Sequence, residues 1–331
     1  MNRIPQQETP MATYKLGSKG EEVRRIQEKL QALGIYRGPL DGDYGGGTEA
    51  AVKLFQEREG LEADGIVGPI TWGKLVGGEA PRPSIEYQPL DYRCLALTGS
   101  FETGAAIPDC FAGVSGDFDG QGISFGVLQW NFGQGSLQPL MKRMFTDYPE
   151  RSRSIFQDRL DLILTRLNGG KADLMAFARS IQHPTRHFLH EPWRGMFKSL
   201  GRTDEFQRIE LDAANSICKA ARQLCADYGL WSERAVALMF DIKVQNGSIN
   251  STVKGQILTD YGNLPTSQGE EESEVERLRI VANRRADAAK ARWREDVRAR
   301  KLCIANGTGA VHGIPYDLDE QFGIGLRRVG V

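Results

Sequence analysis

The sequence lacks any long uninterrupted apolar run. Nowhere do about 18 apolar residues follow one another, so no segment is typical of a membrane-spanning helix. The opening residues, MNRIPQQETPMATYK, also lack the apolar stretch of a secretory signal. We therefore expect a protein that is made without such a signal, folds in a cytoplasm and has no membrane partner.

An excess of charge of either sign is lacking as well. The 42 Lys and Arg residues face 43 Asp and Glu residues, which gives a formal net charge of −1. Because this balance provides no basic field, it disfavours nucleic acid as a partner. With 40% hydrophobic and 26% charged residues, the 331-residue chain is typical of a globular protein with room for two domains.

Cysteine is scarce and shows no metal-binding spacing. The five cysteines are thinly spread and include no CxxC pair of a zinc site. We expect them to be buried thiols. A bridge between Cys94 and Cys110 is an alternative that cytoplasmic synthesis disfavours.

The zinc-hydrolase motif HExxH is absent from the sequence. The pattern GxSxG occurs once, as GISFG at residues 122–126, but it lies inside the predicted hairpin and not at the strand-to-helix turn that a serine nucleophile requires. His183, His187 and His190 lie close together in HPTRHFLHE, but Pro184 interrupts the helix that would align the first two. We predict neither a metal nor a cofactor.

What the sequence does contain is an internal repeat. DGDYGGGT begins at Asp41 and DGIVGPIT begins at Asp64, so the pattern DGxxGxxT occurs twice. Asp-Gly favours a tight turn, and Thr48 and Thr71 are expected to cap the helices that follow. Apolar residues at helical spacing predict a bundle of three short helices.

The repeat segment, LGSKGEEVRRIQEKLQALGIYRGPLDGDYGGGTEAAVKLFQEREGLEADGIVGPITWGKL, closely resembles the type 1 peptidoglycan-binding domain. The resemblance implies that residues 13–77 form a domain that binds the glycan–peptide mesh of a bacterial wall. Exposed turn residues are the implied wall contacts: Tyr36, Asp41, Asp43, Tyr44 and Asp64.

Residues 78–90 are expected to be a linker, because GGEAPRPSIEYQPL combines paired glycines with three prolines. Residues 91–331 are predicted to be largely helical, from apolar spacings of three and four. The expected helices are Pro139–Tyr148, Ile155–Leu167, Lys171–Ile181, Glu205–Tyr228, Ser232–Gln245 and Glu270–Leu302. The predicted fold class is mainly α: a small three-helix bundle plus a larger α-rich, lysozyme-like domain with a β-hairpin over Ile123–Asn131.

The chemistry centres on Leu95–Asn131. Glu102 ends an amphipathic run that Gly104 is expected to stop in the left-handed conformation. The helix dipole and apolar neighbours would both disfavour an ionised carboxylate there, so Glu102 can act as a general acid. Asp117 and Asp119 follow in the Gly-rich loop GDFDGQG, where a carboxylate stays solvated. Two carboxyls in contrasting environments are what glycosidic bond cleavage requires.

The remaining roles follow from position in this segment. Asp119 is the predicted base that holds a water across the sugar ring, with Asp117 as the alternative base and a substrate contact. Ser124, just after the acidic loop, is placed to position that water. Gln129 and Asn131, on the hairpin, are predicted to hydrogen-bond sugar hydroxyls or N-acetyl groups.

SFGVLQWN is similar to the hairpin strand of the lysozyme superfamily. More narrowly, SFETG followed by FDGQGISFGVLQ resembles the chitosanase-like branch, glycoside hydrolase family 46. This resemblance implies Glu102 as acid, Asp119 as base and Ser124 as water holder, while Gln121 stands where chitosanases tend to carry Arg. Together with the wall-binding resemblance, it implies peptidoglycan rather than chitosan as substrate.

A second polar cluster lies in ALMFDIKVQNGSIN. Asp241 and Gln245 are four residues apart on one face of an otherwise apolar helix, and a buried carboxylate needs a partner. Either Asp241 anchors a structural network, or it lines the substrate cleft with Gln245 and Asn246. We keep all three as candidate substrate contacts. Further on, CIANGTGAVHG is expected to be a loop.

The sequence thus predicts a modular, monomeric peptidoglycan hydrolase that cleaves β-1,4 bonds of the glycan strand. Without a signal, it would reach the wall as a phage-type endolysin released through a membrane pore, or as an effector of a contractile secretion system. A lytic transglycosylase that uses Glu102 alone, a chitosanase and a non-catalytic wall-binding protein are the alternatives.

Overall fold

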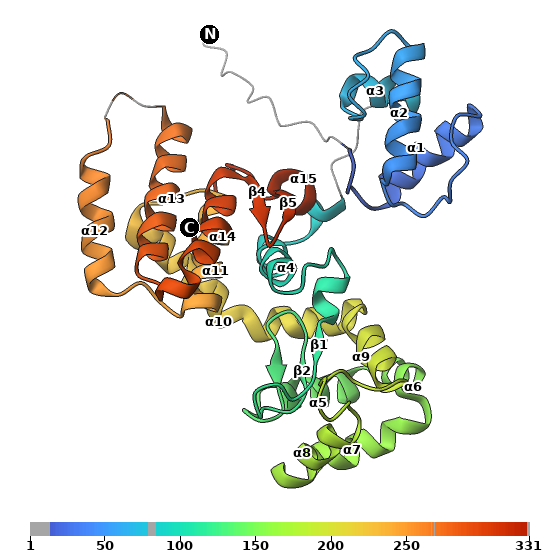
Figure 1. Cartoon of the computed structure of the whole chain (residues 1–331), viewed down its shortest axis with the longest axis vertical. Coiled ribbons are helices and arrows are strands. Elements are labelled where there is room, and N and C mark those ends of the chain that lie inside the picture. Colours follow the sequence, from blue (N-terminus) through green and yellow to red (C-terminus); the bar gives the residue numbers. More distant parts are fainter. Residues whose placement is uncertain (1–13, 79–83, 266, 268, 330–331) are drawn as a thin grey trace. The chain divides into compact units, whose positions relative to one another are not determined.

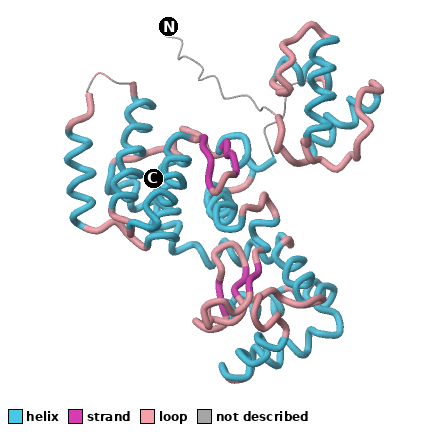
Figure 2. Tube along the Cα trace, viewed as in Figure 1, coloured by secondary structure: helices cyan, strands magenta, loops and turns pink. Residues whose placement is uncertain are grey.

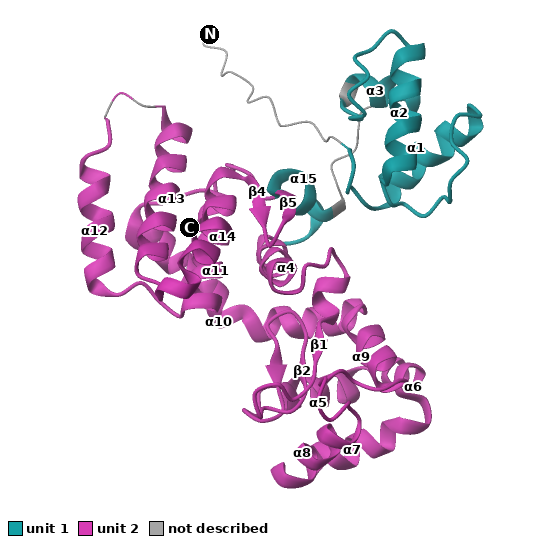
Figure 3. Ribbon diagram, in the orientation of Figure 1, with its two compact units in different colours: residues 1–89, 317–323 teal, residues 90–316, 324–331 magenta. Residues whose placement is uncertain are grey.

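The computed structural model describes residues 14–78, 84–265, 267 and 269–329. These residues form two compact units (Figure 3). The first comprises the described residues up to 89 together with 317–323, and the second comprises 90–316 with 324–329. The expected boundaries 13–77, 78–90 and 91–331 stay a prediction, and residues 13, 79–83, 266, 268 and 330–331 within them lie outside the described residues.

The first unit contains three short helices around a small core (Figure 1). They are α1 (Glu21–Ala32), α2 (Gly46–Arg58) and α3 (Pro69–Leu75), accompanied by the 3-10 helix η1 (Ser84–Tyr87) and by α15 (Leu318–Phe322). The core consists of Val23, Ile26, Leu30, Val52, Phe55, Trp72 and their neighbours. Within this unit Lys15 Nζ pairs with Asp317 Oδ2 at 2.9 Å and with Glu320 Oε2 at 2.6 Å, so a C-terminal segment completes it.

The first repeat turn closes around a buried glutamine. Gln27, from α1, has no exposed surface. Its Oε1 accepts the backbone N–H of Gly42 at 2.9 Å, while its Nε2 donates to Asp41 Oδ1 at 2.9 Å and to Thr48 Oγ1 at 3.3 Å. The Asp, Gly and Thr of the DGxxGxxT pattern therefore form a structural motif together with a glutamine on the preceding helix.

The second turn repeats this arrangement. Gln56 accepts the N–H of Gly65 at 2.9 Å and donates to Asp64 Oδ1 at 2.8 Å and Thr71 Oγ1 at 3.3 Å. The expected capping role of the two threonines is wrong, because each hydroxyl accepts from the glutamine and neither helix has a side-chain cap.

Helices dominate the second unit (Figure 2). They are α4 (Leu90–Thr103), η2 (Asp109–Ala112), α5 (Leu137–Asp147), α6 (Pro149–Phe156), η3 (Gln157–Arg159), α7 (Leu160–Asn168), α8 (Lys171–Ser180), α9 (Trp193–Gly201), α10 (Asp204–Tyr228), α11 (Glu233–Asn246), α12 (Ser251–Gly262), α13 (Glu270–Asp287), η4 (Ala291–Trp293) and α14 (Arg294–Asn306). The predicted class, mainly α with a small β component, is confirmed. No described helix combines the length and apolar character needed to cross a membrane.

The pattern over Glu270–Leu302 predicted one helix, but the structure has two. α13 ends at Asp287, η4 follows, and α14 runs back along α13. Apolar residues such as Val281 and Val297 are buried on the two helices. Folding the pattern in half buries both apolar stripes, which one straight helix would leave without a partner.

The predicted hairpin is present and has a third strand. β2 (Ser124–Phe125) pairs antiparallel with β3 (Trp130–Asn131), and β1 (Val114–Ser115) pairs with the other edge of β2. A second hairpin, β4 (Thr308–Val311) and β5 (Ile314–Asp317), lies where the sequence predicted a loop.

Two glycines bring α4 against the three-stranded sheet. A Cβ at Gly99 would lie 2.1 Å from Val127 Cγ2, so only glycine allows this approach. A Cβ at Gly113 would lie 2.9 Å from Thr103 Cγ2 and 3.0 Å from Gln129 Nε2. The end of α4 is therefore fixed beside the turn that joins β2 to β3.

We predict that Gln27→Glu destabilises the first unit. Glutamate cannot donate the Nε2 hydrogen bonds, and it places a second carboxylate against Asp41 in a buried position. The free energy of unfolding should fall by about 2–3 kcal/mol, the usual cost of unsatisfied buried polar groups. Urea denaturation of the full chain, with hydrogen exchange at Gly42 as the local readout, measures it. Gln31→Glu, exposed on the same helix, is the control, and equal stability of the two variants would contradict the prediction.

Candidate active site

Glu102 lies in the last turn of α4, where the sequence placed it. The helix ends at Thr103, and Gly104 follows with a φ of 68°. The backbone N–H of Gly104 donates to the carbonyl of Ser100 at 2.8 Å, which closes the helix. The Glu102 side chain is 40% exposed and can therefore meet a ligand from solvent.

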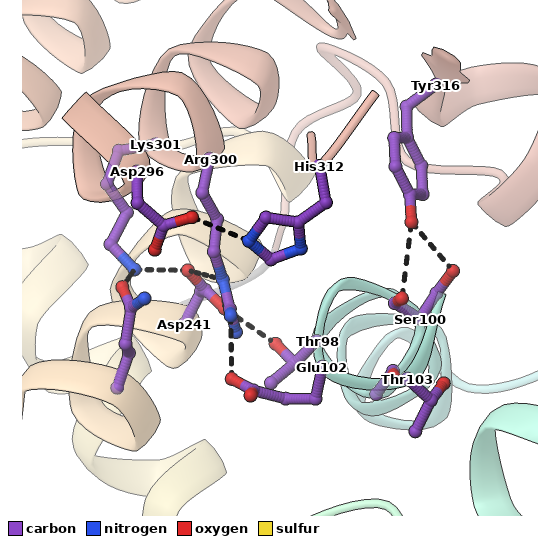
Figure 4. A network of polar contacts seen from close by, with 12 residues as sticks. Thr98, Ser100, Glu102, Thr103, Asp241, Asp296, Arg300, Lys301, His312 and Tyr316 are labelled. Atoms are coloured by element: carbon purple, nitrogen blue, oxygen red, sulfur yellow. Dashed lines mark hydrogen bonds and ion pairs between the residues drawn. The ribbon is translucent and has the colours of Figure 1, made fainter. Parts of the chain in front are cut away.

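Arg300, from α14, contacts Glu102 directly (Figure 4). Its Nη1 donates to Glu102 Oε1 at 2.6 Å, and its guanidinium lies 5.1 Å from the centre of the Phe101 ring. The Arg300 side chain is almost completely buried. The prediction for Glu102 named only apolar neighbours and the helix end, and the structure adds a buried guanidinium that holds one of its two oxygens.

Asp241 explains why that guanidinium can be buried. Its side chain has no exposed surface, and its carboxylate accepts from Arg300 Nη2 at 2.6 Å and from Thr98 Oγ1 at 3.2 Å. Lys301 Nζ, also fully buried, donates to the other oxygen. Burial acts to raise the pKa of Asp241, but Arg300 and Lys301 outweigh it and lower the pKa to about 2. Burial lowers the pKa of Lys301 to about 8.

The structure therefore decides between the two interpretations of Asp241. It anchors a structural network, and as a substrate contact it is corrected, because no ligand reaches a fully buried carboxylate. Gln245 accepts from Lys301 Nζ at 2.8 Å, and Asn246 Oδ1 is buried without a hydrogen-bond partner among the described residues. Substrate contact by these two residues stays a prediction.

The two aspartates of the Gly-rich loop differ in their surroundings. Asp117 is half-buried, its Oδ1 accepts from the N–H of Gly122 at 2.8 Å, and its own N–H donates to Gln182 Oε1 at 2.7 Å. Asp119 is exposed and its Oδ1 accepts from the N–H of Gln121 at 3.1 Å. Asp117 thus holds the loop, while Asp119 keeps a carboxylate oxygen in solvent.

Ser124 and Asn131 face each other across β2 and β3. Ser124 is partly exposed, whereas Asn131 is 8% exposed and its Oδ1 accepts from the N–H of Gln134 at 2.8 Å. The carbonyl oxygen of Asn131 thus closes a turn of the chain, and a sugar contact by this residue stays a prediction.

Gln129 is used internally as well. It has a φ of 55°, and its Nε2 donates to the carbonyls of Gly126 at 2.8 Å and Gly113 at 3.2 Å, while its Oε1 accepts from Ser115. A sugar contact by Gln129, which is partly exposed, stays a prediction. Gln129 ties the hairpin turn to β1.

The expected wall contacts divide in the same way. Tyr36 and Tyr44 are only 7% and 2% exposed, and their hydroxyls donate to backbone carbonyls, so the expectation that they are exposed is wrong. Asp41 and Asp64 are exposed but accept from the buried glutamines. Hydrogen bonds from the backbone of Asp43 and from Gln27 lower the pKa of Asp41. Asp43 pairs with Lys19 at 2.8 Å and stays exposed.

Histidines and cysteines serve no visible chemical site. Among the described residues no three His, Cys, Asp or Glu side chains are grouped closely enough to hold a metal ion. His183 Nδ1 accepts from the backbone N–H of Arg186 at 3.1 Å. The five cysteines are buried, as predicted, and the alternative bridge is wrong because Cys94 and Cys110 are both free thiols.

Arg300 and Lys301 are the site residues that the sequence analysis missed. Their signal is their place in α14, where the buried residues Val297, Arg300, Lys301 and Ile304 follow helical core spacing. Two cations in an apolar stripe require a buried anion, and Asp241 had been recognised as an anion in need of a partner.

Residues 19–75 match the family model described as a putative peptidoglycan binding domain, which confirms the resemblance predicted for this segment. A spore cortex-lytic enzyme of Oceanobacillus iheyensis is 47% identical over 60 residues, covering 18% of this chain and 22% of that protein. An N-acetylmuramoyl-L-alanine amidase of Mycobacterium tuberculosis is 39% identical over 75 residues, covering 19% and 18%. The match thus spans about a fifth of the length of these relatives.

Among solved structures, the chain is similar to a chitosanase from Bacillus subtilis MY002. The TM-score is 0.41 and the sequence identity 16%, over 67% of this chain and 89% of that chain.

We predict that Asp241→Asn destabilises the second unit by about 3–5 kcal/mol, because it leaves Arg300 and Lys301 buried without their anion. Folding lowers the pKa of Asp241 from 3.8 to about 2, so its contribution is present above about pH 4 and is lost as the pH falls through 2. Chemical denaturation between pH 5 and 2 should show this loss in the natural protein and not in the variant.

Asp260→Asn is the matched control for this prediction. Asp260 also pairs with an arginine, Arg284, but both side chains are partly exposed. Its loss should cost less than about 1 kcal/mol, the usual value of a surface ion pair. Similar losses in the two variants would contradict the importance of burial.

Proposed function

We propose that this protein hydrolyses the glycan strand of peptidoglycan, with Glu102 as general acid and Asp119 as general base. The observation that carries the proposal is an exposed carboxyl whose one oxygen is fixed by a buried charge network. Arg300 holds Glu102 Oε1, and Asp241 holds Arg300. This arrangement leaves Oε2 of Glu102 to carry a proton toward a ligand.

The reaction follows from these positions. Glu102 donates its proton to the glycosidic oxygen as the bond to the anomeric carbon breaks. A water molecule attacks that carbon and gives a proton to Asp119, whose exposed carboxylate suits this role. Ser124, partly exposed on β2, orients the water in this proposal. A carboxyl locked by its neighbours needs no rearrangement when the substrate arrives.

The choice of polymer rests on the first unit. Its match to a peptidoglycan-binding model supports a wall substrate, because a tethered binding domain raises the effective concentration of an enzyme at an insoluble polymer. A monomer suffices for this arrangement, and it needs neither nucleic acid nor membrane as a partner. We propose action in the periplasm after release through a phage-type pore, with secretion-system delivery as the second route.

A lytic transglycosylase is the second candidate. The contacts that hold Glu102 in place, with Arg300 and through it with Asp241, do not involve Asp119, so they would equally serve a reaction that needs no base for water. Such an enzyme would close an anhydro ring on the sugar with Glu102 alone. The products distinguish the two reactions.

We predict that Glu102→Gln lowers activity on purified peptidoglycan by about 10²–10⁴-fold, the usual contribution of general acid catalysis. The rate at which each protein releases fragments from the wall measures this loss. Mass spectrometry of the fragments from the natural protein identifies the reaction: reducing ends support hydrolysis, whereas anhydromuramic ends would reject it. Glu205→Gln, which removes another partly exposed Glu–Arg pair, is the control and should retain activity. Undiminished activity in a folded Glu102→Gln protein would reject the acid, and a preference for chitosan would reject the substrate.

The assignment of the base has its own prediction. Asp119→Asn should lower kcat by about 10²-fold or more without loss of stability, because its side chain is exposed. Asp117→Asn should weaken the loop, through the N–H of Gly122, and lower kcat by less than about tenfold. Steady-state kinetics with thermal unfolding of both variants decides between them. The reverse order would assign the base to Asp117.

A further inference from the structure

We propose that Glu210 is a positioning residue that clamps the β2–β3 turn against the helix of Glu102 through the backbone N–H of Val127, and that ionisation of its carboxyl as the pH rises releases the clamp. The clamp itself is independent of any activity. Its effect on catalysis rests on the proposed function.

Glu210 lies on α10 and has no exposed surface. Its Oε1 accepts the backbone N–H of Val127 at 3.0 Å. The turn leaves room for this carboxyl only because residue 126 is glycine: a Cβ at Gly126 would lie 2.0 Å from Oε1, and its φ is 87°. The carboxyl therefore occupies a space that the turn provides for it.

Val127 transmits this contact to the candidate acid. Its Cγ2 would lie 2.1 Å from a Cβ at Gly99, so its side chain packs directly on α4. Gly99 precedes Glu102 by three residues, which is about one helical turn. A displaced Val127 would therefore let the Glu102 turn of α4 move relative to Ser124 and the sheet.

Among the residues that the structure describes, no charged group lies close enough to Glu210 to stabilise a carboxylate. The titratable groups that face it are Tyr92 of α4 and Cys110 of η2, and burial raises the pKa of both side chains, so both are neutral. Its Oε2 has no hydrogen-bond partner among the described residues. Burial raises the pKa of Glu210 well above 4.5, although the hydrogen bond from the N–H of Val127 acts to lower it. An unpaired buried carboxylate is far more costly than the neutral acid.

The pH dependence follows from this. Folding raises the pKa of Glu210, so its stabilising contribution is full below about pH 4.5, the ordinary value, and is lost as the pH rises toward the value in the fold. Opening of the turn then releases a proton. Within this window each pH unit increases the open population by up to about tenfold.

Glu210→Gln and Glu210→Ala test the clamp in the full chain. Glutamine keeps an oxygen for the Val127 N–H and cannot ionise, whereas alanine removes the acceptor. The readouts are the hydrogen-exchange protection of Val127, corrected for intrinsic exchange, and kcat/KM on peptidoglycan, both from pH 5 to 10. Glu205→Gln, which removes the partly exposed partner of Arg151 on the same helix, is the control.

We expect the protection of Val127 to fall with rising pH in the natural protein and in Glu205→Gln. It should stay level in Glu210→Gln. In Glu210→Ala it should be lower by about tenfold or more at every pH. The alkaline limb of kcat/KM should move to higher pH in Glu210→Gln. A pH profile of Val127 protection that is the same in Glu210→Gln and the natural protein overturns the clamp. If the alkaline limb of kcat/KM is unchanged in Glu210→Gln, it belongs to another group, such as Lys301, and the catalytic role of Glu210 is overturned. Absence of any activity rejects the proposed function alone, because the exchange measurement still tests the clamp.

Discussion

The ion pair between Asp241 and Arg300 determines the geometry of the second unit at its candidate site. Both groups are buried, so each charge needs the other. Arg300 can direct its Nη1 at Glu102 only while Asp241 pairs with its Nη2. Three elements far apart in sequence, α4, α11 and α14, meet in this one set of contacts. Burying Arg300 alone would be costly, but the buried pair of Arg300 and Asp241 fixes the exposed carboxyl of Glu102 in place.

Two buried carboxyls lie near the end of α4 and are neutralised by different means. Asp241 keeps its charge because two cations surround it, whereas Glu210 is surrounded by neutral groups and keeps its proton. The first supports Glu102 through Arg300 and the second through Val127 and Gly99. Asp241 thus supports the side chain of Glu102 and loses its charge at low pH, whereas Glu210 supports the backbone near Glu102 and loses its proton as the pH rises.

Features set by a few neighbouring residues could be predicted from the sequence. The end of α4 at Gly104, the DG turns and the β2–β3 hairpin all depend on local conformational preferences, and the structure contains each of them. Partnerships across long separations could not be predicted: Glu102 and Arg300 are 198 residues apart, and a charged run on α14 is ordinarily a solvated face. The break after Asp287 has no proline to mark it. A sequence also does not show which polar groups hydrogen-bond within the fold, as the side chains of Gln129 and Asn131 do.

The helix α15 gives the chain an unusual route. The backbone passes between the two units after residue 89, again after 316 and once more after 323, and Lys15 depends on Asp317 and Glu320 for its ion pairs. After a cut within the predicted linker, residues 317–323 would still belong to the first unit although they are covalently part of the polypeptide that forms the second. A module exchange that moved only the N-terminal segment to another enzyme would leave Lys15 without its acidic partners and transplant an incomplete unit.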